Sequence, residues 1–286
     1  MRFLVIGALA WDAPVRLSGA LRSGARLTGR PLPERLGGGG ANAGCAIARA
    51  GHQACVATYL GQDARADALR NAAERAGLDL SLCSSHDHPT GQTQILIEPS
   101  GERAILHVRA FDSSATAPAL PPLLADVGAF DGVFVRAHYP GAADIAMTHA
   151  GPVILHWPPS RIMPFPADVL VGSRDDLDGA FGTDPLREAR AEVSDRLRWV
   201  VLTDGANGAT AYGEAGSIHQ PAHPASLVDA TGAGDVFAAG LLEALAAGAS
   251  IGAALDHASG WAKVVVEREY SALCDPATDR LVAFAP

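Results

Sequence analysis

The segment from position 228 to 240, VDATGAGDVFAAG, carries the residues best suited to chemistry. Its small residues Gly232, Ala233 and Gly234 precede an Ala-rich run that is apolar almost all round, which is typical of a buried helix. Backbone N–H groups at such a helix start converge on one point, at the positive end of the helix dipole. The segment therefore predicts an anion hole, suited to a phosphate or to the charge that develops during phosphoryl transfer.

Asp235 follows this glycine-rich turn directly. A carboxylate at that place can simply cap the N-terminus of the helix. Beside an anion hole it can also accept the proton of an incoming hydroxyl group and so act as a general base. Capping requires neither the flanking glycines nor a second acid, Asp229, so we favour the catalytic interpretation of Asp235.

A second glycine run, Gly37 to Gly40, precedes another helical pattern and leads into Asn42. Glycines let the backbone approach a small ligand closely, and Asn42 offers both a donor and an acceptor to hydroxyl groups. A dinucleotide-binding turn is the alternative. That turn directly follows the first strand of its fold, whereas this run lies far downstream of the first predicted strand, 3–9.

The elements that must position these residues alternate along the chain. Short β-branched runs are separated by Ala- and Leu-rich segments of helical period, which predicts a mostly parallel sheet with helices on both faces. The predicted strands are 3–9, 54–60, 132–136, 153–157, 169–172, 199–203 and 209–212. The predicted helices are 41–50, 64–76, 142–149, 185–196, 235–247 and 251–267. The expected fold class is α/β, with a three-layer, Rossmann-like αβα core.

One segment breaks this alternation. Residues 93–98 and 104–109 are two strand-like runs joined by Pro-Ser-Gly-Glu-Arg, a pattern that predicts an antiparallel hairpin. We expect a small β-lid, built from about 13–36 and 88–110, as an appendage to the core. Helical and strand patterns resume directly after each Pro-rich loop, so the whole chain, 1–286, is expected to be one domain.

The composition disfavours several classes of function. A formal net charge of −9, from 22 Lys and Arg against 31 Asp and Glu, argues against nucleic-acid and anionic-membrane partners. Aromatic residues make up 6%, which is few for a surface that stacks bases. The sequence contains no apolar stretch of the roughly 18 residues that a membrane span needs. Its four dispersed cysteines fit reduced thiols, so we expect a cytoplasmic protein with small-molecule ligands.

The segment around Asp235 resembles the C-terminal signature of the ribokinase-like (PfkB) carbohydrate kinase family, D-[TA]-T-G-A-G-D-x-F. The glycine run and Asn42 resemble the family's N-terminal signature, G-G-x-x-x-N-x-A…G. Weaker similarities occur in family order: Asp12 after the first strand, the lid hairpin, and the strand and loop at 203–208. Because the order holds across nearly the full chain, the sequence is identified as a member of this family.

The resemblance implies a ribokinase-like core and transfer of the γ-phosphoryl group of ATP to a hydroxyl group of a sugar or sugar-like acceptor. It implies Asp235 as the base and the backbone from Gly232 to Asp235 as the anion hole. The residues implied at the acceptor are Asp12, Gly38, Gly39 and Asn42. Those implied at the nucleotide are Ser173, Thr203, Gly205, Gly208 and His257. A nucleoside or sugar-phosphate kinase and a degenerate, non-catalytic binding homologue remain alternatives.

The chain departs from the family pattern where ions are expected. Ser173 and Asp176 stand where an N-x-x-E motif organises magnesium, so Asp176 is implied in the outer shell of Mg²⁺. Asp229 and Thr231 resemble one half of a monovalent-cation site. The other half usually contains a Gly-Ala pair, which residues 268–272 lack, so a requirement for a monovalent cation is left open.

The acceptor pocket departs from the pattern as well. Ala10 and Gly39 replace an asparagine and a lysine that are common in the family, so we do not expect the pocket of a ribose kinase. Family members often pair through their lids, and the resemblance therefore suggests a homodimer.

Overall fold

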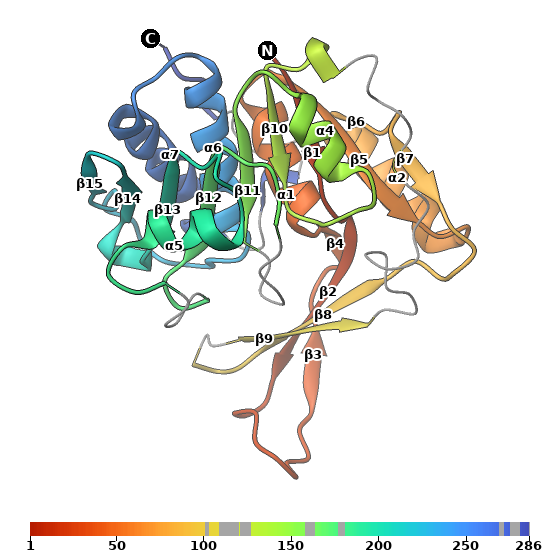
Figure 1. Cartoon of the computed structure of the whole chain (residues 1–286). Coiled ribbons are helices and arrows are strands. Elements are labelled where there is room, and N and C mark those ends of the chain that lie inside the picture. Colours follow the sequence, from red (N-terminus) through yellow and green to blue (C-terminus); the bar gives the residue numbers. More distant parts are fainter. Residues whose placement is uncertain are drawn as a thin grey trace.

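A mostly parallel sheet forms the centre of the protein, shown as a computed structural model in Figure 1. Its strands are β1 (Arg2–Ile6), β5 (Gln53–Leu60), β6 (Leu78–Asp79), β7 (Cys83–Ser85), β10 (Gly132–Val135), β11 (Val153–His156), β12 (Val169–Ser173), β13 (Trp199–Thr203), β14 (Ala209–Gly213) and β15 (Gly216–Gln220). Their order is β15-β14-β13-β12-β11-β10-β1-β5-β6, and β7 pairs with the last residues of β5. The pairings of β14 with β13 and β15 are antiparallel, and the others in this sheet are parallel.

The structure describes residues 1–100, 103–108, 120, 127–157, 164–176, 181–268, 272–274 and 281–285. Within these ranges we find no helix with the length and apolar character of a membrane span.

Helices cover both faces of the central sheet. One face carries α1 (Gly39–Arg49), α2 (Ala64–Arg75), α6 (Ala233–Ala246) and α7 (Ile251–Val266), and the other carries α4 (Ala142–Thr148) and α5 (Pro185–Glu192). Short 3-10 turns are η2 (Val127–Ala129), η3 (Gly205–Asn207) and η4 (Ala272–Cys274). β10 and residues 3–6 of β1 are apolar and buried because side chains on both of their faces meet helices. The predicted three-layer α/β core is confirmed.

A second, smaller sheet projects from one end of the core (Figure 1). It consists of β2 (Ala10–Leu17), β3 (Gly29–Pro31), β4 (Arg35–Gly37), β8 (Gln92–Ile97) and β9 (Arg103–Val108). The order is β3-β2-β8-β9, with β4 paired to the start of β2. The predicted hairpin is present as the antiparallel pair β8 and β9. Residues 101–102 and 109–110 of the predicted lid lie outside the described residues.

Several predicted boundaries were wrong, for local reasons. The first predicted strand, 3–9, ends at Ile6, because the chain then passes so close to α1 that a Cβ on Gly7 would lie 2.8 Å from the Cα of Gly40. The helix predicted from 235 begins at Ala233, because Gly232 takes the left-handed conformation (φ 77°) and serves as its N-cap.

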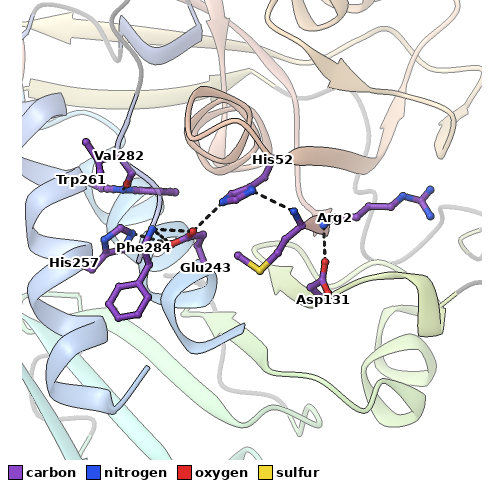
Figure 2. Close-up of polar contacts among 9 residues, drawn as sticks. Arg2, His52, Asp131, Glu243, His257, Trp261, Val282 and Phe284 are labelled. Carbon is purple, nitrogen blue, oxygen red and sulfur yellow. Dashed lines mark hydrogen bonds and ion pairs between the residues drawn. The ribbon is translucent and has the colours of Figure 1, made fainter. Parts of the chain in front are cut away.

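Helix α6 is fixed by Glu243, a carboxylate with no exposed surface (Figure 2). Its Oε1 lies 2.9 Å from Nε2 of His52, and its Oε2 lies 2.9 Å from Nε2 of His257 on α7. The backbone N–H of Phe284 donates to both oxygens, at 3.1 and 3.2 Å. Burial raises the pKa of Glu243, but the contacts with His257, His52 and Phe284 outweigh it and leave the pKa below its usual value. The carboxylate is therefore ionised at neutral pH.

Substitution of Glu243 by alanine should destabilise the fold. It leaves partly buried donors of His52, His257 and Phe284 without their acceptor, and a buried group in this position costs about 1–3 kcal/mol. We expect the free energy of unfolding, measured by urea titration, to fall by at least about 2 kcal/mol. Glu74→Ala, on the exposed face of α2, is the matched control, and an equal effect of both substitutions would contradict the anchoring role.

Candidate active site

The two glycine-rich segments meet at one end of the central sheet. Gly38 and Gly232 are the N-caps of α1 and α6, and both have positive φ, 87° and 77°. A Cβ on Gly38 would lie 2.6 Å from the carbonyl oxygen of Ala8, and one on Gly232 would lie 2.8 Å from Cγ of Asn42. Both positions therefore need glycine, and the close contact of Gly232 with Asn42 brings the starts of the two helices together.

Asp235 lies in the first turn of α6 and is 8% exposed. Its Oδ2 accepts a hydrogen bond from Nδ2 of Asn42 at 2.9 Å, and its Oδ1 accepts one from Nε of Arg136 at 3.0 Å. Nδ1 of His156 lies 3.4 Å from the same Oδ1. The Oδ1 of Asn42 is buried and accepts no hydrogen bond from the described residues, so it is available to a ligand hydroxyl group.

The charge on Asp235 is maintained by its neighbours. Burial raises the pKa of Asp235, but the positive charge of Arg136 and the hydrogen bond from Asn42 outweigh burial and leave the pKa below its usual value. Burial, together with Arg136, lowers the pKa of His156 to about 4, so this histidine is neutral at neutral pH. Arg136 is therefore the positive charge that keeps Asp235 ionised and able to accept a proton.

Arg136 and His156 were missed by the sequence analysis as site residues. Arg136 directly follows β10 and His156 ends β11, and the carboxyl ends of parallel strands are where α/β proteins place their ligands. The signal in the sequence was a polar residue at the carboxyl end of a predicted strand, which could have identified both residues. The position of Arg136 also explains Gly39, because a Cβ there would lie 2.5 Å from Cγ of Arg136.

Asp12 lies on β2, where the small sheet leaves the core, and is 5% exposed. Burial raises its pKa to about 6, although the charge of Arg35 and a hydrogen bond with Thr93 act in the opposite direction. A Cβ on Gly37 would collide with the Asp12 carboxylate. The first glycine of the run therefore makes room for this acid.

A cavity of about 460 Å³ adjoins the start of α6. Three residues expected at the nucleotide, Thr203, Gly205 and Gly208, line it together with Ala233 and Gly234 of the predicted anion hole. The remaining wall is largely apolar: Ala206, Ala222, His223, Pro224, Ala225, Leu227, Ala230, Phe237, Ser259, Ala262, Lys263 and Val266. A mostly apolar cleft of this size that ends at a helix N-terminus suits a nucleotide, with its base in the cleft and its phosphates at the helix.

Ser173 is the last residue of β12, and Asp176 lies in the turn that follows. Ser173 pairs with Thr203 on β13, and its Oγ accepts a hydrogen bond from the backbone N–H of Asp176 at 2.9 Å. Asp176 is exposed, and its negative charge acts on His156. Ser173 is therefore next to Thr203 of the cavity, and Asp176 is close enough to act on His156.

His257, on α7, packs beside Glu243. It is absent from the described lining of the cavity, and its ring packs against Trp261 and Phe284 beside Glu243. Its expected contact with the nucleotide is thus not supported, because the buried Glu243 holds this side chain elsewhere.

An arginine side chain contacts the two residues that were expected to bind a monovalent cation, Asp229 and Thr231. Nη1 of Arg103 donates to Oδ1 of Asp229 at 2.5 Å and to Oγ1 of Thr231 at 2.7 Å. Residues 269–271, in the other half of the expected ion site, lie outside the described residues. Among the described side chains we find no group of three His, Cys, Asp or Glu residues arranged to hold a metal ion.

Comparison with known proteins shows a family relationship over nearly the whole chain. A model of the pfkB family of carbohydrate kinases matches residues 5–278. A ribokinase of Bacillus subtilis is 26% identical over 271 residues, which are 92% of each chain. An ATP-dependent ribose-1-phosphate kinase of Halopiger xanaduensis is 27% identical over 300 residues, 99% of this chain and 98% of that one.

Solved structures show the same fold. The ribokinase of Arabidopsis thaliana, in complex with ribose and ATP, aligns with a TM-score of 0.77. The alignment covers 98% of this chain and 96% of that one at 22% identity. At this identity the comparison supports the ribokinase-like arrangement of elements.

The buried carboxyl group of Asp12 should cost stability. Because its pKa in the folded protein is raised from 3.8 to about 6, the folded state binds the proton more tightly, and stability falls as the pH rises through this window. Asp12→Asn should therefore raise the free energy of unfolding at neutral pH by roughly 1–3 kcal/mol. The gain should disappear toward about pH 4, where Asp12 is protonated in the parent protein.

Urea unfolding at several pH values measures this difference. Asp67→Asn, an exposed acid on α2, is the control and should bring no gain. A gain for Asp12→Asn that does not change with pH would show that the buried charge is not its cause.

Proposed function

This chain belongs to the pfkB family of carbohydrate kinases, and from that premise we propose that Asp235 is the base of its phosphoryl transfer. As a ribokinase-family sugar kinase it carries out ATP-dependent phosphorylation of a sugar hydroxyl group. The observation that supports the assignment is the buried carboxylate of Asp235, which Asn42 and Arg136 hold at the start of α6. The backbone N–H groups of Gly232, Ala233 and Gly234 lie beside it in the same turn.

The acceptor binds, in this proposal, between Asp12, Asn42 and the backbone of Gly38 and Gly39. The carboxylate of Asp12 accepts hydrogen bonds from sugar hydroxyl groups, and so does the available Oδ1 of Asn42. Glycine at positions 38 and 39 lets the main chain approach the sugar. The small sheet, which includes parts of 13–36 and 88–110, closes over the acceptor and excludes water as a competing nucleophile.

The reaction is an in-line displacement at the γ-phosphorus. The acceptor oxygen attacks phosphorus while Asp235 removes its proton, the bond from phosphorus to the bridging oxygen breaks, and ADP leaves with that electron pair. The N–H groups from Gly232 to Asp235 donate hydrogen bonds to the oxygens of the transferring group. Arg136 keeps Asp235 ionised until the proton arrives.

The nucleotide is assigned to the cavity lined by Thr203, Gly205 and Gly208, with Ser173 beside it. Exposed Asp176 suits the outer shell of a hydrated ion, and Mg²⁺ bound mainly by the nucleotide phosphates would neutralise charge on their oxygens. A cytoplasmic location and a homodimer through the small sheet stay predictions.

Ribose is the first acceptor to test, because a ribokinase is among the relatives, while Ala10 and Gly39 predict that ribose is not the acceptor. A sugar phosphate is the second candidate, since one relative is a ribose-1-phosphate kinase and Arg136 places a guanidinium group beside Asp235. Release of ADP with ribose, ribose 1-phosphate and a panel of nucleosides and sugar acids separates these acceptors. A chain that binds ATP but phosphorylates no member of the panel would instead fit a non-catalytic homologue.

Replacement of Asp235 by asparagine should abolish most of the turnover and leave nucleotide binding intact. A positioned base contributes about 10²–10⁴-fold, so kcat should fall by that factor. The amide has nearly the same size, so the cavity that receives ATP is unchanged. Rapid-quench phosphorylation assays give kcat, and calorimetry gives the Kd of ATP.

Asp144→Asn is the matched control, since Asp144 is an exposed acid in the first turn of α4. It should keep the kinetic constants of the parent protein. Near-full turnover of the Asp235→Asn variant would refute the assignment of the base.

The pH profile should distinguish the two acids of the site. Because the pKa of Asp12 is raised to about 6, kcat/KM for the acceptor should fall as the pH drops through this value, where the carboxylate becomes protonated. The pKa of Asp235 lies below its usual range, so its protonation affects the rate only at a much lower pH. Asp12→Asn should remove the inflection near 6, and its persistence in that variant would assign it to another group.

A further inference from the structure

Arg103 connects the small sheet to the loop that leads into the anion hole. It is the first residue of β9, and its Nη1 contacts both Oδ1 of Asp229 and Oγ1 of Thr231. Asp229 and Arg103 are far apart in the sequence, so this contact forms only when the small sheet packs against the core. The side chains are 29% exposed for Arg103 and 15% exposed for Asp229, which makes this a partly buried ion pair.

The loop that Arg103 contacts is held from two sides. On the core side, the N–H groups of Val228 and Asp229 donate to the carbonyl oxygen of Val266 at the end of α7, at 2.7 and 3.2 Å. Within the loop, Oδ1 of Asp229 accepts hydrogen bonds from the N–H and the Oγ1 of Thr231, at 2.8 and 2.6 Å. The next residue is Gly232, the N-cap of α6. The Asp229 carboxylate therefore sets the conformation in which the chain enters the anion hole.

The charge of Asp229 requires compensation at this place. An uncompensated carboxylate three positions before Gly232 would repel the phosphate oxygens that the helix N-terminus is built to attract. The guanidinium group of Arg103 neutralises it through charge-assisted hydrogen bonds, which are about twice as strong as neutral ones.

We propose that Arg103 is a positioning residue for phosphoryl transfer. Its guanidinium group, which belongs to the chain itself, is the cation that pairs with Asp229. The anion hole is complete only when the small sheet packs against the core. The proposal rests on the function proposed above. The arginine lies where the sequence analysis left open a monovalent cation, bound by Asp229 and Thr231. Because the guanidinium group of Arg103 is part of the chain, it is always present beside Asp229, and catalysis needs no K⁺ or Na⁺.

The kinetic test compares Arg103→Met, Arg103→Lys and the parent protein, in KCl and in choline chloride of equal ionic strength. The parent should have the same kcat in both salts. Loss of the guanidinium should lower kcat of Arg103→Met by about 10²-fold through misplacement of the anion-hole backbone. Arg103→Lys, added guanidinium ion or added K⁺ should restore part of this loss. Arg75→Met, an exposed arginine of α2 outside the small sheet, should match the parent.

Hydrogen exchange of the peptide that spans 226–236 gives a readout that does not depend on turnover. Arg103→Met should speed exchange there, while Arg75→Met should not. Parent-like kcat and exchange in Arg103→Met, or a parent protein that requires K⁺, would overturn the proposal. Suppose that exchange speeds up in Arg103→Met as expected but the parent protein phosphorylates no acceptor. The contact of Arg103 with Asp229 then orders the loop, and the proposed kinase reaction is the part that is refuted.

Discussion

The carboxylate of Asp235 is removed from water and yet must stay ionised, and the neighbouring structure is arranged around this constraint. Burial alone would favour the protonated acid, which could not take a proton from an alcohol. Arg136 supplies the opposing charge, Asn42 donates a hydrogen bond, and the N-terminus of α6 adds its dipole. Room for the arginine exists because position 39 has no side chain. Gly39 on α1 and Arg136 after β10 thus both help to keep the negative charge on Asp235.

The core of the fold could be predicted because its signals are local. Continuous apolar runs mark strands that are buried on both faces, and a glycine before a helical pattern marks the start of a helix such as α6. The small sheet was harder to predict. All residues of β3 are exposed and give no pattern, and the parallel pairing of β2 with β8 joins segments that are distant in the sequence. Such pairing depends on tertiary contacts that no window of sequence contains.

The same distinction applies to the candidate site. The sequence singled out Asn42 and Asp235 because each belongs to a dense glycine-rich motif, and the structure brings the two side chains into contact. Arg136 and His156 are single polar residues at the ends of apolar strands, so no motif marks them. His257, which the resemblance implied at the nucleotide, is not among the described residues that line the cavity. Its helix passes beside the cavity, but its ring lies against the buried Glu243.

The helix that carries Asp235 is linked through Glu243 to two segments that are far from it in the sequence, one at His52 and one at Phe284. His52, which contacts Glu243, is also 3.3 Å from the amino group of Met1, and Phe284 donates its N–H to the same carboxylate (Figure 2). A ribosome must therefore synthesise the chain through Phe284 before this anchor can form.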